Sequence, residues 1–269
     1  MKILCIGHAS YDTTIPMCGF LEENTKLRID TKFECNAAYL LGKWGLDVAF
    51  IGVVGNDKYG NYIKKELDEV NVDTRYMRIL DAYETTSSII FANVESGTRT
   101  IVSYRPGEAE KLKNVDLDFE PSIILVDGHE YELSKNMIEK YPKAVSIMDA
   151  GRVTEDNLKL ASMVDYVVCS KEFAETVTEV SLDGSNYEEL YDKMKEKFKK
   201  NVIVTLENKG CLYEYEGELK IMPGIEVKTI DSTGAGDIFH GAFTYGVAVN
   251  WDLETILKFS NVTAGLSVT

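Results

Sequence analysis

The stretch "DSTGAGDIFHGAF", residues 231–243, places a turn of small residues directly before a carboxylate and an apolar helix. Apolar side chains lie on nearly every side of that helical segment, which predicts that it is buried. The turn ends in Gly234, Ala235 and Gly236, which leave the main-chain amides at the helix start uncovered. Such amides bind anions, phosphate included, without a basic side chain. The carboxylate that follows them, Asp237, is therefore the first residue to explain.

The residues alone leave two interpretations of Asp237 open. In the first, Asp231 or Ser232 caps the turn, and the charge of Asp237 stabilises the first helical turn. In the second, the amides bind a phosphoryl group and the carboxylate takes the proton from an attacking hydroxyl, while Mg²⁺ helps to stabilise the transferring charge. The second interpretation predicts a phosphotransferase.

The rest of the chain alternates short apolar runs with helical patterns, which predicts an α/β fold. Alternation of this kind is typical of a mostly parallel sheet with helices on both faces. Two segments break the rhythm, 26–35 and 85–107, and predict a small antiparallel sheet. That sheet is either a lid over a cleft or an edge hairpin. The apolar runs of the main sheet are residues 2–7, 47–55, 122–126, 144–148, 164–168 and 201–205.

The composition excludes several classes of protein. The 269 residues carry a formal net charge of −15, which argues against nucleic acid or an anionic membrane as a partner. None of the five cysteines forms a CxxC pair, so we expect free thiols in a reducing cytoplasm. No apolar stretch approaches the roughly 20 residues needed to cross a bilayer. The three histidines lack zinc-site spacing, and neither GxxxxGK[ST] nor GxGxxG follows a strand.

The stretch at 231–243 resembles the C-terminal signature of the ribokinase/PfkB family of carbohydrate kinases. "NAAYLLGKWG" (36–45) and "VGNDKYG" (54–60) resemble its N-terminal signature region. Further segments match in order and spacing, namely 99–112, 204–218 and 261–269. The resemblance covers essentially the whole chain. It implies a single domain over 1–269, a ribokinase-like three-layer α/β/α sandwich with a mostly parallel sheet, and a small antiparallel β lid inserted at about 12–35 and 72–107.

The resemblance implies an ATP-dependent kinase that phosphorylates a hydroxyl of a sugar or a sugar-like molecule, with ATP and Mg²⁺ as cofactors. Asp237 would be the catalytic base, and the amides of Gly234, Ala235 and Gly236 would form the anion hole. A nucleoside kinase of the same fold and a non-catalytic ligand-binding member remain alternatives. A closed lid would exclude water, and its projecting sheet offers a surface for a homodimer.

Other roles carry over position by position. Asp12 and Asn36 would bind the substrate, and Arg105 is a candidate for a phosphate or carboxylate of the substrate, with a surface ion pair as its alternative. Asp127 and Glu130 follow a predicted strand, where α/β folds place ligand-binding residues. The nucleotide would contact Ser170, Thr205, Gly210 and Asn261, while Asp231 and Thr233 match a monovalent-cation site, for K⁺. His240 is expected to be a core histidine with satisfied hydrogen bonds.

Three departures from the family pattern limit these assignments. A glycine pair usually precedes the signature asparagine, but here Cys35 leads directly to Asn36, so either the substrate loop is shortened or a loop is missing from the sequence. An Asn-x-x-Glu motif is replaced by Ser170 and Phe173, as in the ketohexokinase-like branch. Relatives also continue beyond Thr269, which leaves cation dependence open. The substrate and the oligomeric state stay unassigned.

Overall fold

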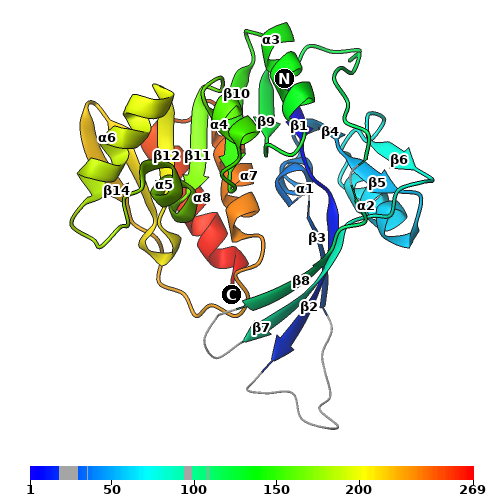
Figure 1. Ribbon diagram of the computed structural model, residues 1–269, viewed down its shortest axis with the longest axis horizontal. Coiled ribbons are helices and arrows are strands. Elements are labelled where there is room, and N and C mark those ends of the chain that lie inside the picture. The colour runs from blue at the N-terminus through cyan, green and yellow to red at the C-terminus, as the bar shows by residue number, and fades with distance from the viewer. Residues whose placement is uncertain (18–29, 35, 94–98, 108) are drawn as a thin grey trace.

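The computed structural model describes residues 1–17, 30–34, 36–93, 99–107 and 109–269. Its centre is an eight-stranded sheet in the order β14-β13-β12-β11-β10-β9-β1-β4 (Figure 1). All neighbours from β4 to β12 pair in parallel, and β13 and β14 add antiparallel strands at one edge. The strands are β1 (Lys2–Ile6), β4 (Asp47–Ile51), β9 (Ile123–Val126), β10 (Val145–Ala150), β11 (Tyr166–Ser170), β12 (Asn201–Thr205), β13 (Cys211–Tyr215) and β14 (Glu218–Met222).

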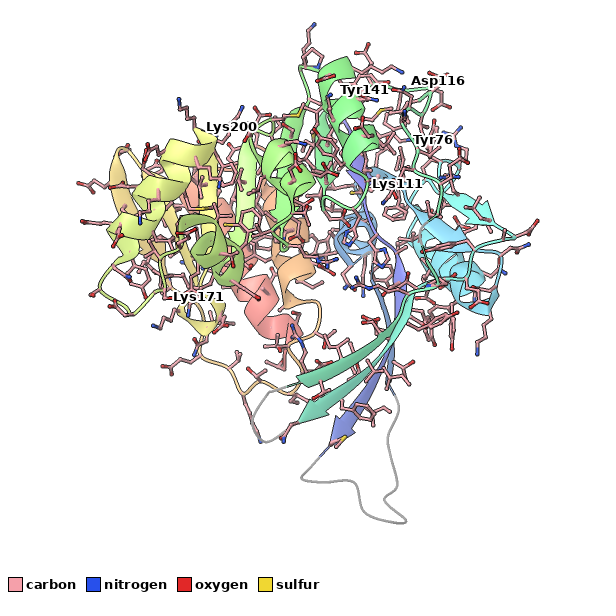
Figure 2. All side chains as sticks on the ribbon, in the orientation of Figure 1. Tyr76, Lys111, Asp116, Tyr141, Lys171 and Lys200 are labelled. Carbon is pink, nitrogen blue, oxygen red and sulfur yellow. The ribbon has the colours of Figure 1, made fainter. Side chains whose placement is uncertain are left out.

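Helices cover both faces of this sheet, which confirms the expected three layers. Strand β1 alternates between two apolar cores: Leu4 and Ile6 belong to one, and Ile3 and Cys5 to the other. The first core is completed by α3 (Tyr131–Lys140), α4 (Glu155–Ala161), α5 (Lys171–Thr178) and α6 (Tyr187–Phe198). The second is completed by α1 (Asn36–Lys43), α2 (Lys58–Glu69), α7 (Ala235–Ala248) and α8 (Leu253–Ser267). Charged side chains such as Asp116 and Lys171 lie outside these cores (Figure 2).

A second sheet of four strands, in the order β3-β2-β7-β8, projects from the main body (Figure 1). Its strands are β2 (Ser10–Met17), β3 (Asp30–Glu34), β7 (Ser87–Asn93) and β8 (Arg99–Tyr104). The two outer pairs are antiparallel, as expected, but the central pair of β2 and β7 is parallel. Because the chain leaves this sheet after β3 and returns through a crossover at β7, a parallel pairing is possible there. Arg99 at the start of β8 donates to Ser232 Oγ at 2.7 Å, so this sheet touches the turn before α7.

The segment expected as the second lid insertion begins outside the small sheet. Within the range 72–107, β6 (Arg78–Leu80) pairs instead with β5 (Val53–Gly55) beside the main body. Cys5, Cys169 and Cys211 are buried free thiols. Cys18 and the Cys35–Asn36 junction lie outside the described residues. No helix in the described part of the chain is both long and apolar enough to span a membrane.

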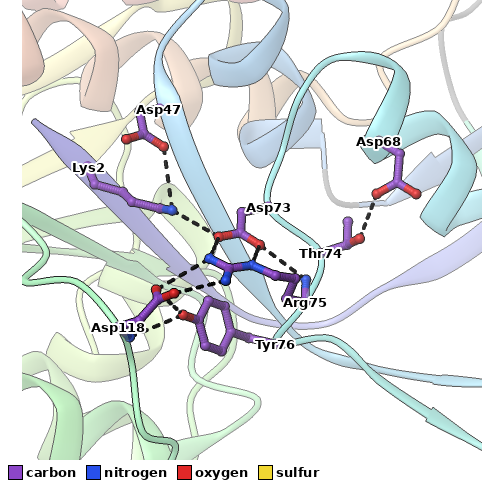
Figure 3. A network of polar contacts seen from close by, with 8 residues as sticks. All are labelled: Lys2, Asp47, Asp68, Asp73, Thr74, Arg75, Tyr76 and Asp118. Atoms are coloured by element: carbon purple, nitrogen blue, oxygen red, sulfur yellow. Dashed lines mark hydrogen bonds and ion pairs between the residues drawn. The ribbon is translucent and has the colours of Figure 1, made fainter.

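A polar network ties the start of β1 to the connection after α2 (Figure 3). The Asp73 carboxylate accepts from Lys2 Nζ at 2.9 Å and from Arg75 Nη2 at 2.8 Å, and Arg75 Nη1 also lies 2.8 Å from Asp118. The backbone of Asp73 continues the pairing, because its amide donates to Val48 O at 2.7 Å. Hydrogen bonds from Arg75 and Lys2 hold the pKa of Asp73 well below its usual range.

We expect Asp73→Asn to destabilise the fold at neutral pH by about 1 kcal/mol, or roughly 2–4 °C in Tm. A carboxylate whose pKa falls on folding adds stability above its unfolded value of about 3.9, and this contribution is lost as the pH drops through the lower folded value. The difference between Asp73→Asn and the wild type should therefore shrink below about pH 4. Urea unfolding at several pH values measures it. Glu69→Gln, which breaks only an exposed 3.5 Å pair with Lys65, is the control and should change little.

Candidate functional site

A cavity of about 240 Å³ opens where β1, β9 and β10 end, against the first turns of α1 and α7. The carboxyl ends of parallel strands are where open α/β sheets bind ligands. Its described lining is Cys5, Ile6, Gly7, His8, Asn36, Ala37, Ala38, Phe50, Leu125, Val126, Asp127, His129, Asp149, Gly151, Arg152, Asp237 and His240. The cavity therefore joins the carboxylate of the opening stretch to residues from the first half of the chain.

Asp237 lies in the first turn of α7 and faces Asn36, the first residue of α1. Asn36 Nδ2 donates to Asp237 Oδ2 at 2.8 Å. The two helices approach closely because Gly241 has no side chain; a Cβ there would lie 3.2 Å from Ala37 Cα. Burial raises the pKa of Asp237, which makes its carboxylate a stronger base than an exposed aspartate. One predicted substrate residue thus orients the predicted base.

The turn before α7 leaves the amides of Gly234 and Gly236 without an acceptor among the described residues, whereas the Ala235 amide makes a long hydrogen bond to Ser232 O at 3.4 Å. Gly234 is the N-cap residue with φ = +75°, and no side chain caps the helix itself. Asp231 caps the turn before it, as one of the two interpretations expected, because its Oδ1 accepts from the Thr233 amide at 2.9 Å. The first amides of any helix have no acceptor within the helix. A Cβ on Gly236 would meet nothing within 4 Å, whereas one on Gly234 would lie 2.9 Å from Asn36 Nδ2. The space in front of Gly236 is therefore open to a ligand.

Asp127 organises the opposite wall. Its Oδ2 accepts from the His8 amide at 2.6 Å and its Oδ1 from the His129 amide at 2.9 Å. Gly7 makes this possible, because a Cβ there would lie 2.3 Å from Asp127 Oδ2. The His8 and His129 rings stack with centroids 4.8 Å apart. Burial lowers the pKa of His8 to about 4, so the ring is neutral at pH 7.

His240 is buried with both ring nitrogens in polar contacts, which confirms the expected core histidine. Its Nε2 lies 3.0 Å from Val168 O, and its Nδ1 lies 2.6 Å from Gly236 O and 3.1 Å from Asp149 Oδ2. All three partners are acceptors, and each ring nitrogen donates only when it carries a proton. Burial raises the pKa of Asp149 to about 6, against the effect of His240. The pair reaches into the same cavity as Asp237.

The residues predicted for the nucleotide are absent from the described lining of this cavity. Ser170 and Thr205 are neighbours in register at the ends of β11 and β12. Ser170 Oγ caps α5, and Thr205 Oγ1 donates to Cys169 O at 3.2 Å. Gly210 and Asn261 both approach the main-chain oxygen of Met222. A Cβ on Gly210 would overlap that oxygen, and Asn261 Nδ2 donates to it at 3.0 Å.

The remaining candidates are more dispersed. Asp12 is buried on β2, with Ser10 Oγ donating to it at 3.1 Å, and its charge acts on Asp237 although it is absent from the described cavity lining. Arg105 follows β8 and is exposed. Asp231 Oδ1 accepts from the Thr233 amide at 2.9 Å, and Thr233 Oγ1 is buried without a partner among the described residues.

Sequence reasoning missed His8, His129, Asp149 and Arg152. Asp149 carried a usable signal, since it lies near the carboxyl end of a predicted parallel strand, as Asp127 does. The two histidines carried none, because they are 121 positions apart in the numbering and meet only through the pairing of β1 with β9.

Comparison with known proteins agrees with this architecture. The family model described as pfkB family carbohydrate kinase matches residues 2–269. A ribokinase of Haemophilus influenzae is 24% identical over 247 residues, covering 87% of this chain and 79% of its own.

Two solved structures share the fold. Arabidopsis thaliana ribokinase, complexed with ribose and ATP, superposes with a TM-score of 0.82 at 20% identity, over 99% of this chain and 92% of its own. A nucleoside kinase of Methanocaldococcus jannaschii gives 0.76 at 20% identity, over 99% and 91%. With the family match spanning nearly every residue, the chain belongs to the pfkB family of carbohydrate kinases.

Proposed function

We propose that this protein transfers the γ-phosphoryl group of ATP to a hydroxyl of a sugar or sugar-like molecule, with Asp237 as the catalytic base. The observation that carries the proposal is the position of Asp237. It lies on the cavity wall, in the first turn of α7 beside open amides, and Asn36 orients it at 2.8 Å. The local capping role of an acid near a helix start does not conflict with this one.

The geometry supports direct transfer to a bound hydroxyl. Asp237 accepts the hydroxyl proton as the oxygen attacks, and the amides of Gly234, Ala235 and Gly236 stabilise the charge on the transferring group. The cavity, at about 240 Å³, is smaller than the roughly 300–1,000 Å³ of drug-sized pockets and suits a monosaccharide. Asp12, Asn36 and Arg105 remain the proposed substrate contacts.

The nucleotide is proposed to lie along the ends of β11 to β13, where Ser170, Thr205, Gly210 and Asn261 are found. The ATP complex of the Arabidopsis ribokinase supports this cofactor. Among the described residues, no three His, Cys, Asp or Glu side chains form a metal-binding group. Mg²⁺ is commonly held by one or two carboxylates together with substrate phosphates, and it would supply charge neutralisation at the transferring phosphoryl group.

A monovalent cation, K⁺, is proposed beside the turn at 231–234. The buried hydroxyl of Thr233, which has no partner in the described chain, and the carboxylate of Asp231 offer oxygen ligands of the kind that hard cations prefer.

Sugar-stimulated ADP release across aldoses, ketoses and nucleosides tests the function. We expect turnover with at least one sugar. Turnover with nucleosides alone would favour the nucleoside kinase, which the similarity to the Methanocaldococcus enzyme keeps as the second candidate. Ligand-induced thermal shifts without any turnover would favour the non-catalytic alternative.

The acid limb of kcat/KM should lie above the usual aspartate range. Asp237 acts as a base only when deprotonated, and burial raises its pKa, so activity is lost as the pH falls through that raised value. Three further carboxylates influence this titration. Asp149 has a pKa of about 6 and interacts with Asp237, and the charges of Asp12 and Asp127 raise the pKa of Asp237. We expect the acid limb, measured with saturating ATP, to lie above the ordinary aspartate pKa of about 3.9. A flat profile down to about pH 4.5 would argue against a buried base.

We also propose that residues 1–269 form one domain, that the small sheet acts as its lid, and that a homodimer forms through this sheet. All six residues of β8 are exposed, and Val102 is 55% exposed. The expected cytoplasmic location likewise stays a prediction.

A further inference from the structure

His240 joins the first turn of α7 to two strands of the main sheet. Its ring is buried, and its Nδ1 lies 2.6 Å from Gly236 O within α7 and 3.1 Å from Asp149 Oδ2 on β10. On the other side of the ring, Nε2 lies 3.0 Å from Val168 O on β11. Asp149 and Val168 are register partners in the parallel sheet. One side chain therefore fixes the start of the helix relative to the ends of both strands.

The contact with Gly236 O acts on the peptide group that precedes the proposed base. Because the peptide bond is planar, the Gly236 carbonyl and the Asp237 amide turn together. The 2.6 Å contact thus sets the direction of the Asp237 N–H and the position of its Cα atom. A carbonyl oxygen can only accept, so this hydrogen bond requires a proton on Nδ1, and the neighbouring Asp149 carboxylate favours a proton there.

Few other contacts hold the main chain of this first turn. It begins Gly-Ala-Gly, and glycine loses more conformational freedom on folding than any other residue. No described side chain caps it, and the Ala235 amide makes only a long hydrogen bond to Ser232 O at 3.4 Å. Asn36 holds the side chain of Asp237, whereas His240 holds the main chain. The turn that carries the base therefore depends on His240 for an anchor in the sheet.

A purely structural role explains this histidine less well. Phe239 and Phe243 fill buried positions of the same helix with apolar rings, so the core beside α7 accepts apolar side chains of this size. Thr244, one turn further along α7, is fully buried, yet its Oγ1 has no partner among the described residues. Burial in this helix does not by itself require hydrogen bonds. At His240 they converge on the turn that faces the cavity.

We propose that His240 is a positioning residue for phosphoryl transfer: anchored on β10 and β11, it holds the Gly236–Asp237 peptide so that the base and the neighbouring amides face the transferring group. The inference rests on the proposed kinase function and goes beyond it, because it gives a buried side chain a role in a reaction whose proton it does not take. Misplacing reacting groups by about 1 Å can cost about a hundredfold in rate. We therefore expect loss of the Gly236 contact to lower kcat and to leave KM for the sugar nearly unchanged.

Two amide replacements separate the two ring nitrogens. In His240→Asn the side-chain NH₂ group lies near the place of Nδ1 and can still donate to Gly236 O, whereas in His240→Gln it lies near the place of Nε2 and reaches toward Val168 O. Each variant keeps one side of the ring's contacts, so both should lose a similar few degrees of Tm. We expect kcat to stay within about threefold of the wild type in His240→Asn and to fall about 30–100-fold in His240→Gln, with KM for sugar and ATP within about threefold in both.

ADP release with D-ribose, D-fructose or adenosine, whichever the wild type uses fastest, measures these constants. Thr244→Val is the matched control, because it alters a buried polar side chain one turn along the same helix and leaves the first turn unchanged. Its kcat should match that of the wild type. Equal kcat values in His240→Asn and His240→Gln would overturn the positioning role. So would a raised KM for the sugar at unchanged kcat, because that pattern indicates direct contact between the ring and the substrate.

Hydrogen exchange gives a readout that does not depend on turnover. The amides of residues 238–241 make the first hydrogen bonds of α7, beginning with Ile238 N to Gly234 O at 3.0 Å. NMR should show them exchanging about tenfold faster in His240→Gln than in the wild type, and at nearly wild-type rates in His240→Asn. If the wild type releases no ADP while this order of exchange holds, the kinase function fails and the anchoring of the turn stands. Equal exchange in the two variants would contradict the anchoring itself.

Discussion

Asp237→Asn is expected to lower kcat by about a thousandfold. A positioned general base contributes roughly 10²–10⁴ to such reactions, and the amide cannot take the hydroxyl proton. Asparagine has nearly the same shape, so binding of the sugar and of ATP should persist with KM values close to those of the wild type. Single-turnover ADP release at saturating sugar measures the loss.

The control for this variant is Asp116→Asn. Asp116 is fully exposed, at the end of the molecule away from the small sheet (Figure 2). The Asp116→Asn variant loses the same charge as Asp237→Asn but leaves the cavity unchanged, so its kcat should match that of the wild type. If Asp237→Asn stays within tenfold of the wild type while melting normally, Asp237 is not the base.

Gly236→Ala is expected to separate activity from stability. The added Cβ meets no protein atom within 4 Å, and alanine favours a helix over glycine by up to about 1 kcal/mol, so Tm should hold or rise. The same methyl group enters the space where the transferring phosphoryl group is proposed to bind. Alanine keeps the main-chain N–H, so the loss would come from the methyl group, which holds the phosphoryl group away from that donor. Losing one donor contact at such a site costs about 10²–10³ in kcat, and we expect a loss of about a hundredfold.

Gly234→Ala provides the contrast. Its φ of +75° strains any side chain, and its Cβ would press on Asn36 Nδ2 at 2.9 Å. We expect this variant to lose both stability and activity. Full kcat in a well-folded Gly236→Ala protein would remove the anion-hole assignment, because nothing else in the described chain occupies that space.

Much of the fold could be predicted from local pattern. The apolar run "IILV" became β9, fully buried as a strand covered on both faces must be. The run of small residues at 234–236 became the start of α7 with an open turn. The parallel pairing of β2 with β7 could not be predicted, because strand direction depends on a crossover of some seventy residues and not on the residues of either strand.

The candidate site, too, could be predicted from the sequence only in part. Asp237 and Asn36 were identified from short motifs, yet the 2.8 Å hydrogen bond between them joins residues 201 positions apart. Asn261 was expected near the nucleotide. The structure shows that its side-chain amide also donates a hydrogen bond to the main-chain oxygen of Met222. A sequence motif identifies residue types, but it does not show which of their atoms remain free of protein contacts and can bind a ligand.

The sequence by itself determined the layered α/β class, the open amides before α7 and the carboxylate in its first turn. These follow from local preferences: apolar periodicity, glycine at a positive φ, and helix geometry. Only the tertiary structure decided that His240 meets Asp149, that His8 stacks on His129, and that Arg152 lines the cavity. Those contacts depend on which strands lie side by side, and long-range pairing is set by packing of the whole sheet.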